Sequence, residues 1–183
     1  MSTAHRYQHS YADYLALEKQ SPLKLEFSDG EIFAMAGGTP EHGALAMQLV
    51  RLITPADGCV VFSSDVKVRI AATDLATYPD VSVVCGALER AADDANAVTN
   101  PRFVVEVTSP STEDYDRGDK LSQYKQLPSL EAVLLISHRR KQVTVVRRSG
   151  TSWSQQEVRG GERVSIAGLG AFEVDVLYSP VAL

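Results

Sequence analysis

The sequence predicts one α/β domain with a mixed central sheet. Several short segments are almost entirely apolar, as strands covered on both faces are. Segments with helical spacing of apolar residues alternate with them, which is the order expected of layered α/β proteins. The chain has 183 residues, of which 44% are hydrophobic and 22% are charged. This length and composition suit a single domain with its own hydrophobic core.

The N-terminal part predicts a helix followed by a hairpin. Apolar side chains recur at spacings of three and four over residues 11–18, which is typical of an amphipathic helix, and Pro22 follows its end. Residues 24–36 alternate in the manner of two short strands, and Asp29-Gly30 is a favourable hairpin turn between them.

A longer helix is predicted over residues 41–53. Thr39 is a good N-cap, and Pro40 suits the first helical position. One face of this helix carries the leucines Leu45, Leu49 and Leu52. That face is expected to cover the sheet.

The remainder is rich in predicted strands. The expected elements are, in order, an alternating strand over 59–70, apolar strands over 80–85 and 102–108, a helix over 117–127, an apolar strand over 132–136, and a hairpin formed by 143–147 and 152–158. Pro128 ends the helix, and Ser149-Gly150 supplies the turn of the hairpin. The polar residues 109–116 are interpreted as a turn.

Charge and composition exclude several classes of protein. The net charge is −5 and the isoelectric point about 5.4, which argues against coating nucleic acid by charge alone but allows a local contact through a metal. Cys59 and Cys85 are too few for a disulfide framework, so a reducing cytoplasm is expected. No apolar run approaches the ~18 residues that span a bilayer, and the first residues lack the apolar core of a signal peptide. No membrane partner is therefore expected.

Glu106 is the residue that departs most from its surroundings. It interrupts Phe103-Val104-Val105-Glu106-Val107, which otherwise has the profile of a buried strand. A buried unpaired carboxylate costs several kcal/mol, so Glu106 needs a cation, a metal or hydrogen-bond donors. Alternatively, it lies at the exposed end of the strand or pairs with a nearby arginine.

Asp80 strengthens the case for a metal site. It opens the preceding apolar strand, where its other interpretation is a turn or cap residue. Consecutive strands are neighbours about two times in three. Carboxylates from Asp80 and Glu106 on adjacent strands would form an oxygen site suited to Mg²⁺ or Mn²⁺.

Lys120 is the third candidate. It lies in the helix after the Glu106 strand and shares a face with Tyr124 at a spacing of four. A helix packed back on that strand would bring its ammonium group to Glu106. The alternative is a solvated surface lysine, which is the common case for this residue type.

Weaker candidates remain. Glu26 alternates with apolar neighbours and is expected at an exposed strand position, and His42 in the first helical turn is expected to be a cap or surface group. Two basic clusters, Arg139-Arg140-Lys141 and Arg147-Arg148, form a patch that flanks one strand. Such a patch is usually a solvated edge, and the alternative is a surface that touches phosphates. The sequence has no glycine-rich phosphate loop and no zinc-type spacing of cysteine or histidine.

Together these residues resemble the PD-(D/E)XK nuclease superfamily and, more narrowly, the bacterial Uma-two family of proposed restriction endonucleases. The resemblance covers roughly residues 11–178. Its motifs are Leu25-Glu26-Phe27-Ser28-Asp29-Gly30-Glu31, the helix with His42, Tyr78-Pro79-Asp80-Val81-Ser82-Val83-Val84, and Val104-Val105-Glu106-Val107-Thr108-Ser109-Pro110-Ser111-Thr112 followed by Asp116, Lys120 and Tyr124.

The resemblance implies a restriction-endonuclease-like core of a helix, three strands, a helix and a strand. On this basis one domain is expected over residues 1–183, with the core at about 40–140, an N-terminal helix and hairpin over 11–36 and a C-terminal hairpin over 143–158.

The resemblance also implies a catalytic set. Asp80 and Glu106 would bind the metal, with the Val107 carbonyl as a further ligand. The superfamily motif would place its lysine at position 108, where this chain has Thr108. In the narrower family the lysine looks displaced to the next helix, here Lys120.

Glu26, Glu31 and His42 match family positions and are accessory candidates. Their roles stay unassigned at this point.

The function predicted from these residues is Mg²⁺-dependent, or Mn²⁺-dependent, hydrolysis of phosphodiester bonds, with DNA as the expected partner. The metal would activate a water molecule, and Lys120 would orient that water and offset charge on the phosphate. A homodimer suits an enzyme that must cut two strands. The rival prediction is a degenerate nuclease fold acting as a non-catalytic binding or scaffolding module. The acidic balance and Thr108 favour this rival, whereas the intact set of Asp80, Glu106 and Lys120 favours the enzyme.

Overall fold

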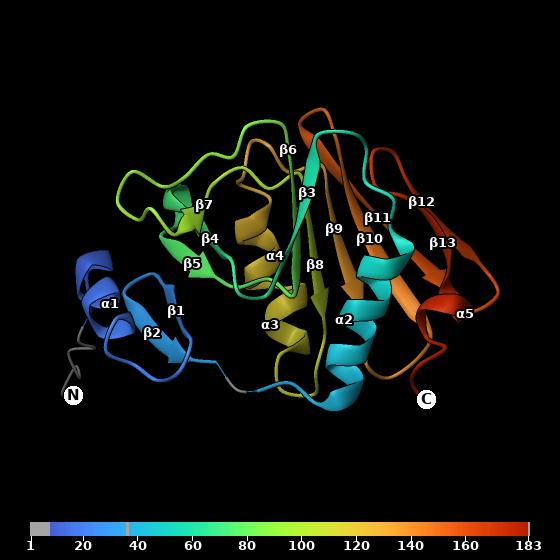
Figure 1. Cartoon of the computed structure of the whole chain (residues 1–183), viewed down its shortest axis with the longest axis horizontal. Helices are drawn as coiled ribbons and strands as arrows, with labels where there is room; N and C mark the ends of the chain where they lie inside the picture. Colours follow the sequence, from blue (N-terminus) through green and yellow to red (C-terminus); the bar gives the residue numbers. More distant parts are fainter. Residues whose placement is uncertain (1–7, 36, 183) are drawn as a thin grey trace, which may run out of the picture.

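The computed structural model describes residues 8–35 and 37–182, and its largest sheet has six strands in the order β11-β10-β9-β8-β6-β3 (Figure 1). Strands β8 and β9 are parallel and the other neighbours are antiparallel, so the sheet is mixed as predicted. Its strands are β3 (Cys59–Ser63), β6 (Val81–Cys85), β8 (Phe103–Val107), β9 (Ala132–Ile136), β10 (Gln142–Ser149) and β11 (Ser152–Arg159).

A second sheet of five strands lies beside the first, in the order β2-β1-β5-β4-β7. Its strands are β1 (Leu25–Ser28), β2 (Glu31–Ala34), β4 (Lys67–Ile70), β5 (Leu75–Thr77) and β7 (Ala97–Val98), and η1 (Ala71–Thr73) joins β4 to β5. The predicted hairpin is confirmed, and both Asp29 and Gly30 at its turn have positive φ. Ala36, at the end of the predicted range, lies outside the described residues.

The prediction of one strand over 59–70 is wrong. The alternation continues through a turn, so β3 and β4 belong to different sheets. All four residues of β4 are buried, including Lys67, whose ammonium contacts Glu18 at 2.5 Å and Asp94 at 2.7 Å. In the sequence, Lys67 looks like an exposed position of an alternating strand, but it is buried and paired with two carboxylates. The alternation therefore did not reveal that the chain passes from one sheet to the other.

Five α-helices complete the described residues: α1 (Tyr11–Glu18), α2 (Pro40–Leu52), α3 (Glu113–Arg117), α4 (Asp119–Tyr124) and α5 (Val174–Leu177). The Thr39 hydroxyl caps α2 as predicted, by accepting a hydrogen bond from the backbone N–H of His42. The α5 helix follows a small sheet of β12 (Arg163–Ile166) and β13 (Gly170–Glu173). No helix among the described residues is long and apolar enough to cross a membrane.

The predicted helix over 117–127 is confirmed only in part, because α4 lies within that range and a break precedes it. Gly118 adopts φ −100° and ψ −100°, which is not helical, and separates α3 from α4. A side chain there would meet the Asp114 carbonyl at 2.9 Å, so the break requires glycine. Of the polar residues 109–116 that were interpreted as a turn, 110–112 do form one, and 113–116 belong to α3.

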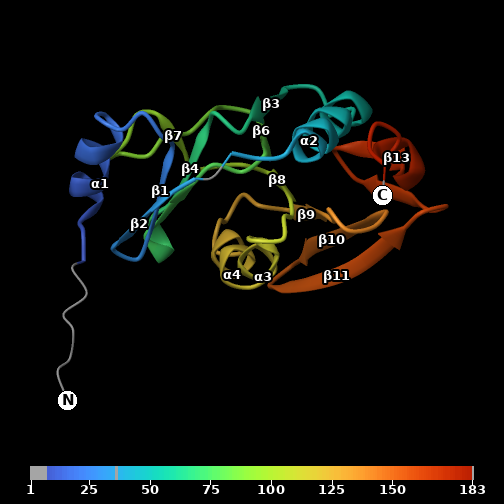
Figure 2. The same ribbon diagram turned by 90° about the horizontal axis from the view of Figure 1, so that it is seen from below.

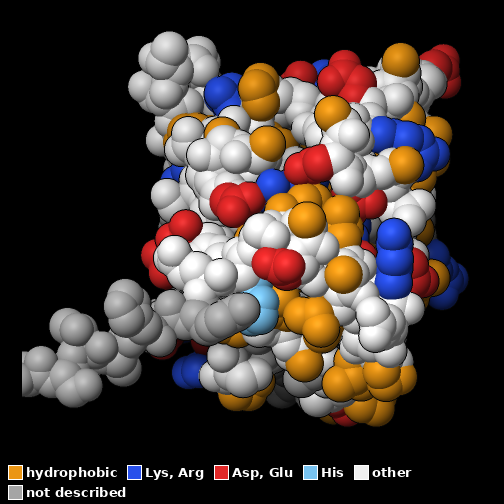
Figure 3. All heavy atoms as spheres, turned by 90° about the vertical axis from the view of Figure 1, so that its left-hand side faces the viewer, with side chains coloured by type: hydrophobic (Ala, Val, Ile, Leu, Met, Phe, Trp, Pro, Cys, Tyr) orange, Lys and Arg blue, Asp and Glu red, His pale blue; other side chains and the backbone are white. Residues whose placement is uncertain are grey.

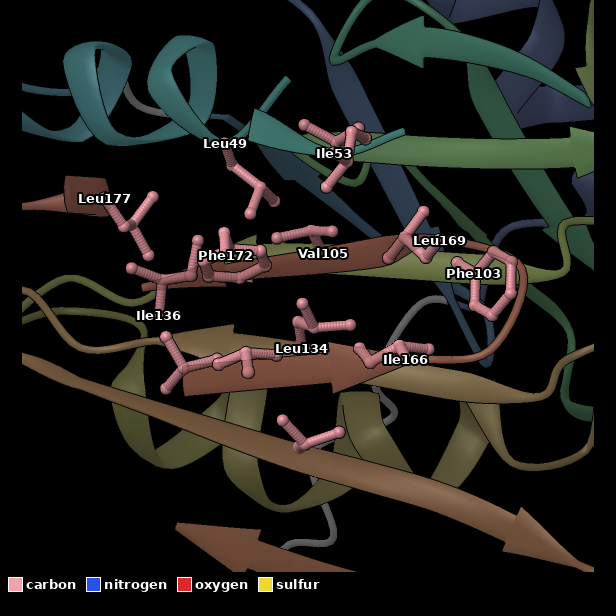
Figure 4. Packing of buried hydrophobic residues seen from close by; sticks show 14 of the residues in the cluster. Leu49, Ile53, Phe103, Val105, Leu134, Ile136, Ile166, Leu169, Phe172 and Leu177 are labelled. Atoms are coloured by element: carbon pink, nitrogen blue, oxygen red, sulfur yellow. The ribbon is translucent and has the colours of Figure 1, made fainter. Parts of the chain in front are cut away.

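The core occupies both faces of the six-stranded sheet. On one face, Val105 and Leu134 pack against α2, α5 and the β12–β13 hairpin (Figure 4). On the other, Val104 packs with Tyr124 of α4 and with Val68 of the second sheet. Figure 2 shows α2 and the α3–α4 pair on opposite sides of the sheet. Strand β8 is therefore covered on both faces, and any polar side chain in it is desolvated.

Cys59 and Cys85 form a disulfide bond between the paired strands β3 and β6. The cysteine count predicted no such bond, because pairing depends on the register that places these two residues opposite each other. This register is a property of the sheet and is not visible in the spacing of the cysteines.

Candidate active site

The sheet places Asp80 and Glu106 opposite each other. Val81 of β6 pairs with Val105 of β8 in antiparallel register, and continuing that register by one residue aligns Asp80 with Glu106. Opposite residues in antiparallel strands have Cβ atoms about 4.5–5.5 Å apart and point to the same face. The two predicted acids are therefore neighbours at one end of the β6–β8 pair.

Glu106 is buried and held by two donors. The Tyr124 hydroxyl donates a hydrogen bond to its Oε1 at 2.5 Å, and Lys120 Nζ lies 2.9 Å from the same atom. The pKa of Glu106 is raised to about 8: burial is the largest cause, the charge of Lys120 opposes it, and the negative charges of Asp80 and Asp116 add to it. Glu106 is not at an exposed strand end.

Lys120 is a buried residue of α4, and the surface alternative is wrong. Its ammonium lies 2.9 Å from Glu106, 3.6 Å from Glu26 and 3.9 Å from Asp116. Burial lowers the pKa of Lys120, but these carboxylates raise it above its ordinary value. Three carboxyl groups thus lie within 4 Å of one ammonium group.

Glu26 does not occupy the exposed position expected of it. Its Oε1 accepts hydrogen bonds from the Thr77 hydroxyl and, at 3.2 Å, from the backbone N–H of Tyr78. It therefore ties β1 to the segment that leads into Asp80, and adds its charge to the cluster beside Lys120. Alternation along β1 correctly turned it away from Phe27, but could not show that α4 covers that side.

His42 lies at the site rather than on the surface. The Asp80 Oδ2 atom accepts a hydrogen bond from the backbone N–H of Val107 at 2.7 Å and lies 3.1 Å from His42 Nε2. The hydrogen bond with Asp80 raises the pKa of His42; burial lowers it, and a hydrogen bond to the Val107 backbone raises it further. His42, in the N-terminal turn of α2, thus contacts two of the three predicted metal ligands, Asp80 and Val107.

Thr108 occupies the position of the lysine in the superfamily motif and points elsewhere. It is fully buried, and its hydroxyl lies 3.3 Å from the Ile136 carbonyl and 3.0 Å from Nδ1 of His138. Position 108 is filled by contacts to the end of β9, and the ammonium beside Glu106 comes from Lys120 instead.

Glu31 lies in a groove beside the hairpin of β1 and β2. It lines this surface groove of about 770 Å³ together with Glu26 and Tyr115. Asp116 and Tyr124 belong to the cluster beside Lys120, although the residue patterns alone assigned them no role. A signal existed in the spacing of four that links Asp116 to Lys120 and Lys120 to Tyr124.

The donor set suits a hard cation. Asp80 and Glu106 supply carboxylate oxygens from neighbouring strands, and such oxygens are the ligands that Mg²⁺ prefers. Among the described residues, no three His, Cys, Asp or Glu side chains form a metal-binding group. Mg²⁺ does not need one, because it is usually held by one or two carboxylates with water and substrate phosphate as the other ligands.

Comparison with known proteins identifies the family. Residues 11–177 match Uma2, described as "Putative restriction endonuclease". The chain belongs to the Uma2 family. The family resemblance inferred from the sequence motifs is thereby confirmed.

Two relatives of this chain come from Synechocystis sp. The uncharacterized protein slr1290 is 35% identical over 175 residues, which cover 93% of this chain and 91% of the relative. The uncharacterized protein sll1609 is 36% identical over 128 residues, covering 68% and 72% respectively.

The fold also matches a solved structure, that of "a putative nuclease belonging to DUF820" from Anabaena variabilis, with a TM-score of 0.70. The match covers 90% of this chain and 97% of that chain at 16% identity. A likeness at this identity is one of fold. It confirms the restriction-endonuclease-like α/β class for this member of the Uma2 family.

Proposed function

We propose that this protein is a metal-dependent nuclease that uses Mg²⁺ or Mn²⁺ to hydrolyse phosphodiester bonds in DNA. The observation that carries the proposal is the Asp80–Glu106 pair on adjacent strands with the Lys120 ammonium 2.9 Å from Glu106. Membership of the Uma2 family supports a nuclease. A homodimer, with one site for each DNA strand, and a cytoplasmic location belong to the same proposal.

Each residue has a distinct task in this reaction. Asp80 and Glu106, with the Val107 carbonyl, would hold the cation, whose chemistry is to acidify a bound water and to polarise the scissile phosphate. Lys120 offsets negative charge on the phosphate as it develops and orients the attacking water. Tyr124 and Lys120 both bind Oε1 of Glu106, which fixes the direction in which that carboxylate points.

Cleavage of plasmid DNA tests the proposal. Wild type should nick or cut in Mg²⁺ or Mn²⁺ and be inactive in EDTA. Asp80→Ala and Glu106→Gln should each abolish cleavage with an unchanged circular dichroism spectrum, because each removes a ligand charge. Asp114→Asn, which changes an exposed acid on α3, is the matched control and should cut like wild type.

Two outcomes would overturn the assignment. Wild-type cleavage by a folded Asp80→Ala or Glu106→Gln variant would place the chemistry elsewhere. A wild type that binds DNA and never cuts it with either metal would instead be the non-catalytic binding module.

A further inference from the structure

The loop that joins β9 to β10 lies at the same edge of the sheet as the candidate active site. Strands β8 and β9 are parallel, with Glu106 paired to Leu135, so both end at one edge, toward which they point in Figure 1. Beyond this pair, the backbone N–H of Thr108 donates to the Ile136 carbonyl at 2.9 Å, and the Thr108 hydroxyl contacts His138. The residues after His138 therefore begin next to the strand end that carries Glu106.

This edge gathers cations from three elements. The cations are Arg139, Arg140 and Lys141 of the loop, Arg117 of α3 and Arg159 of β11, and we call them the basic edge. Arg117 and Arg139 both pair with Glu113, at 3.1 and 3.0 Å. Arg159 lies across from Gln142, the residue that follows the loop.

The basic edge is exposed, and some of its ion pairs are weak. The side chains of Arg139, Lys141 and Arg159 are 63%, 47% and 68% exposed. Glu113, whose side chain is 19% exposed, pairs with both Arg117 and Arg139. The pairs of Lys141 with Asp175 and of Arg159 with Glu157 are exposed on both sides and contribute between about 0 and 1 kcal/mol, so these carboxylates hold their cations only loosely. A phosphate can replace them, and arginine binds phosphate through two parallel hydrogen bonds.

Arg147 and Arg148, which the sequence grouped with this patch, do not belong to it. Arg148 donates to the backbone carbonyls of Leu130, Lys125 and Leu127, and Arg147 donates to that of Ser165. Both lie toward the opposite end of β10, where Arg147 pairs with Ala132 at the start of β9. Their guanidinium groups donate to backbone carbonyls of the fold, so the predicted patch is reduced to Arg139, Arg140 and Lys141.

The other side of the site is acidic. The groove between the β1–β2 hairpin and α3–α4 is lined by Glu26, Asp29, Glu31 and Asp119, with no lysine or arginine among its described lining residues. The face at the left of Figure 1 carries acidic, basic and hydrophobic side chains interspersed (Figure 3), so its acidic character is confined to the groove. Phosphates are repelled by such a groove and attracted by the basic edge.

We propose that the basic edge binds the phosphodiester backbone of DNA and leads it over His138 and Thr108 to the Asp80–Glu106 pair. This inference rests on the proposed nuclease function and adds the direction from which the substrate reaches the site. It also explains how a chain of net charge −5 holds a polyanion, since the attraction comes from one local surface.

Fluorescence anisotropy with fluorescein-labelled DNA tests the proposal in EDTA, where cleavage does not intervene. The test variant is Arg139→Gln with Arg140→Gln. The matched control is Lys19→Gln with Arg51→Gln, which removes two exposed charges, one from the C-cap of α1 and one from the far end of α2. Duplex and single-stranded DNA are titrated in separate experiments, because both carry the phosphodiester groups that the basic edge would bind.

The test variant should bind at least about tenfold more weakly than wild type in low salt, and the control within about twofold. The slope of log affinity against log salt should fall by about 2 for duplex DNA, one unit for each lost phosphate contact. In Mg²⁺, the test variant should show a raised KM with kcat near that of wild type. The experiment with the stronger binding identifies the form of DNA.

Equal binding by the two double variants would overturn the inference, as would a wild type that binds neither form of DNA. Failure of the nuclease proposal is distinguishable, because it appears as absent cleavage by wild type in Mg²⁺ and Mn²⁺ while the binding difference in EDTA persists.

Discussion

The metal-free protein should lose stability as the pH rises from about 5 to about 8, which is the reverse of the trend that paired surface acids produce. Burial raises the pKa of Glu106 from 4.5 to about 8. Between these values the folded protein retains a proton that the unfolded chain has released. The free energy of unfolding therefore falls with increasing pH, and the contribution is complete below about pH 4.5 and lost through about pH 8.

The magnitude follows from the pKa difference. At 1.36 kcal/mol per pKa unit, Glu106 contributes about 5 kcal/mol across this window. Asp116 and His42 act in the same direction, because burial raises the pKa of Asp116 and the hydrogen bond with Asp80 raises that of His42. Both hold protons longer in the folded state, so no cancellation is expected from them.

Urea unfolding in EDTA at about pH 5, 6, 7 and 8 measures this dependence. Glu106→Gln, which keeps the shape of the side chain but cannot titrate, should flatten the profile by about 1 kcal/mol per pH unit. The control Glu89→Gln changes an exposed glutamate and should reproduce the wild-type slope. Added Mg²⁺ should flatten the wild-type profile, because binding requires the ionised carboxylate.

A wild-type profile that is flat or rising over this range would refute the argument. So would a Glu106→Gln profile with the wild-type slope, since the titrating group would then lie elsewhere.

Two further predictions concern Lys120 and the disulfide. Lys120→Ala should lower the cleavage rate by a factor of roughly 10². The Mg²⁺ affinity should change little, because the lysine is not a ligand. Lys125→Ala is the control, and a wild-type rate in Lys120→Ala would contradict the assigned role. Reduction of the Cys59–Cys85 bond by dithiothreitol should lower the free energy of unfolding by about 3 kcal/mol. Dithiothreitol should not affect the stability of a Cys59→Ala, Cys85→Ala double variant. An unchanged urea midpoint of the wild type after reduction would contradict the prediction.

Local patterns in the sequence were sufficient for several features. The Thr39-Pro40 start of α2 and the Asp29-Gly30 turn follow from backbone preferences that act within a few residues. The apolar strands around Glu106 follow from the same kind of local signal. Glu106 itself was conspicuous because a charge in an apolar strand needs a partner wherever that strand lies.

Other features depend on contacts between distant segments. The patterns could not show that Glu26 and His42 reach the Lys120–Asp80 region, because β1 and α2 are brought there by the packing of two sheets and by the direction of α2. Arg139 and Arg148 look alike in sequence, yet one is exposed at the site edge and the other is bonded to backbone carbonyls.

The sequence by itself determined which residues must be buried, capped or turned, since those preferences are satisfied by near neighbours. Only the tertiary structure decided which charges share a site. The energy of a buried charge depends on desolvation and on partners supplied by strand register and helix packing, and local spacing encodes neither of these.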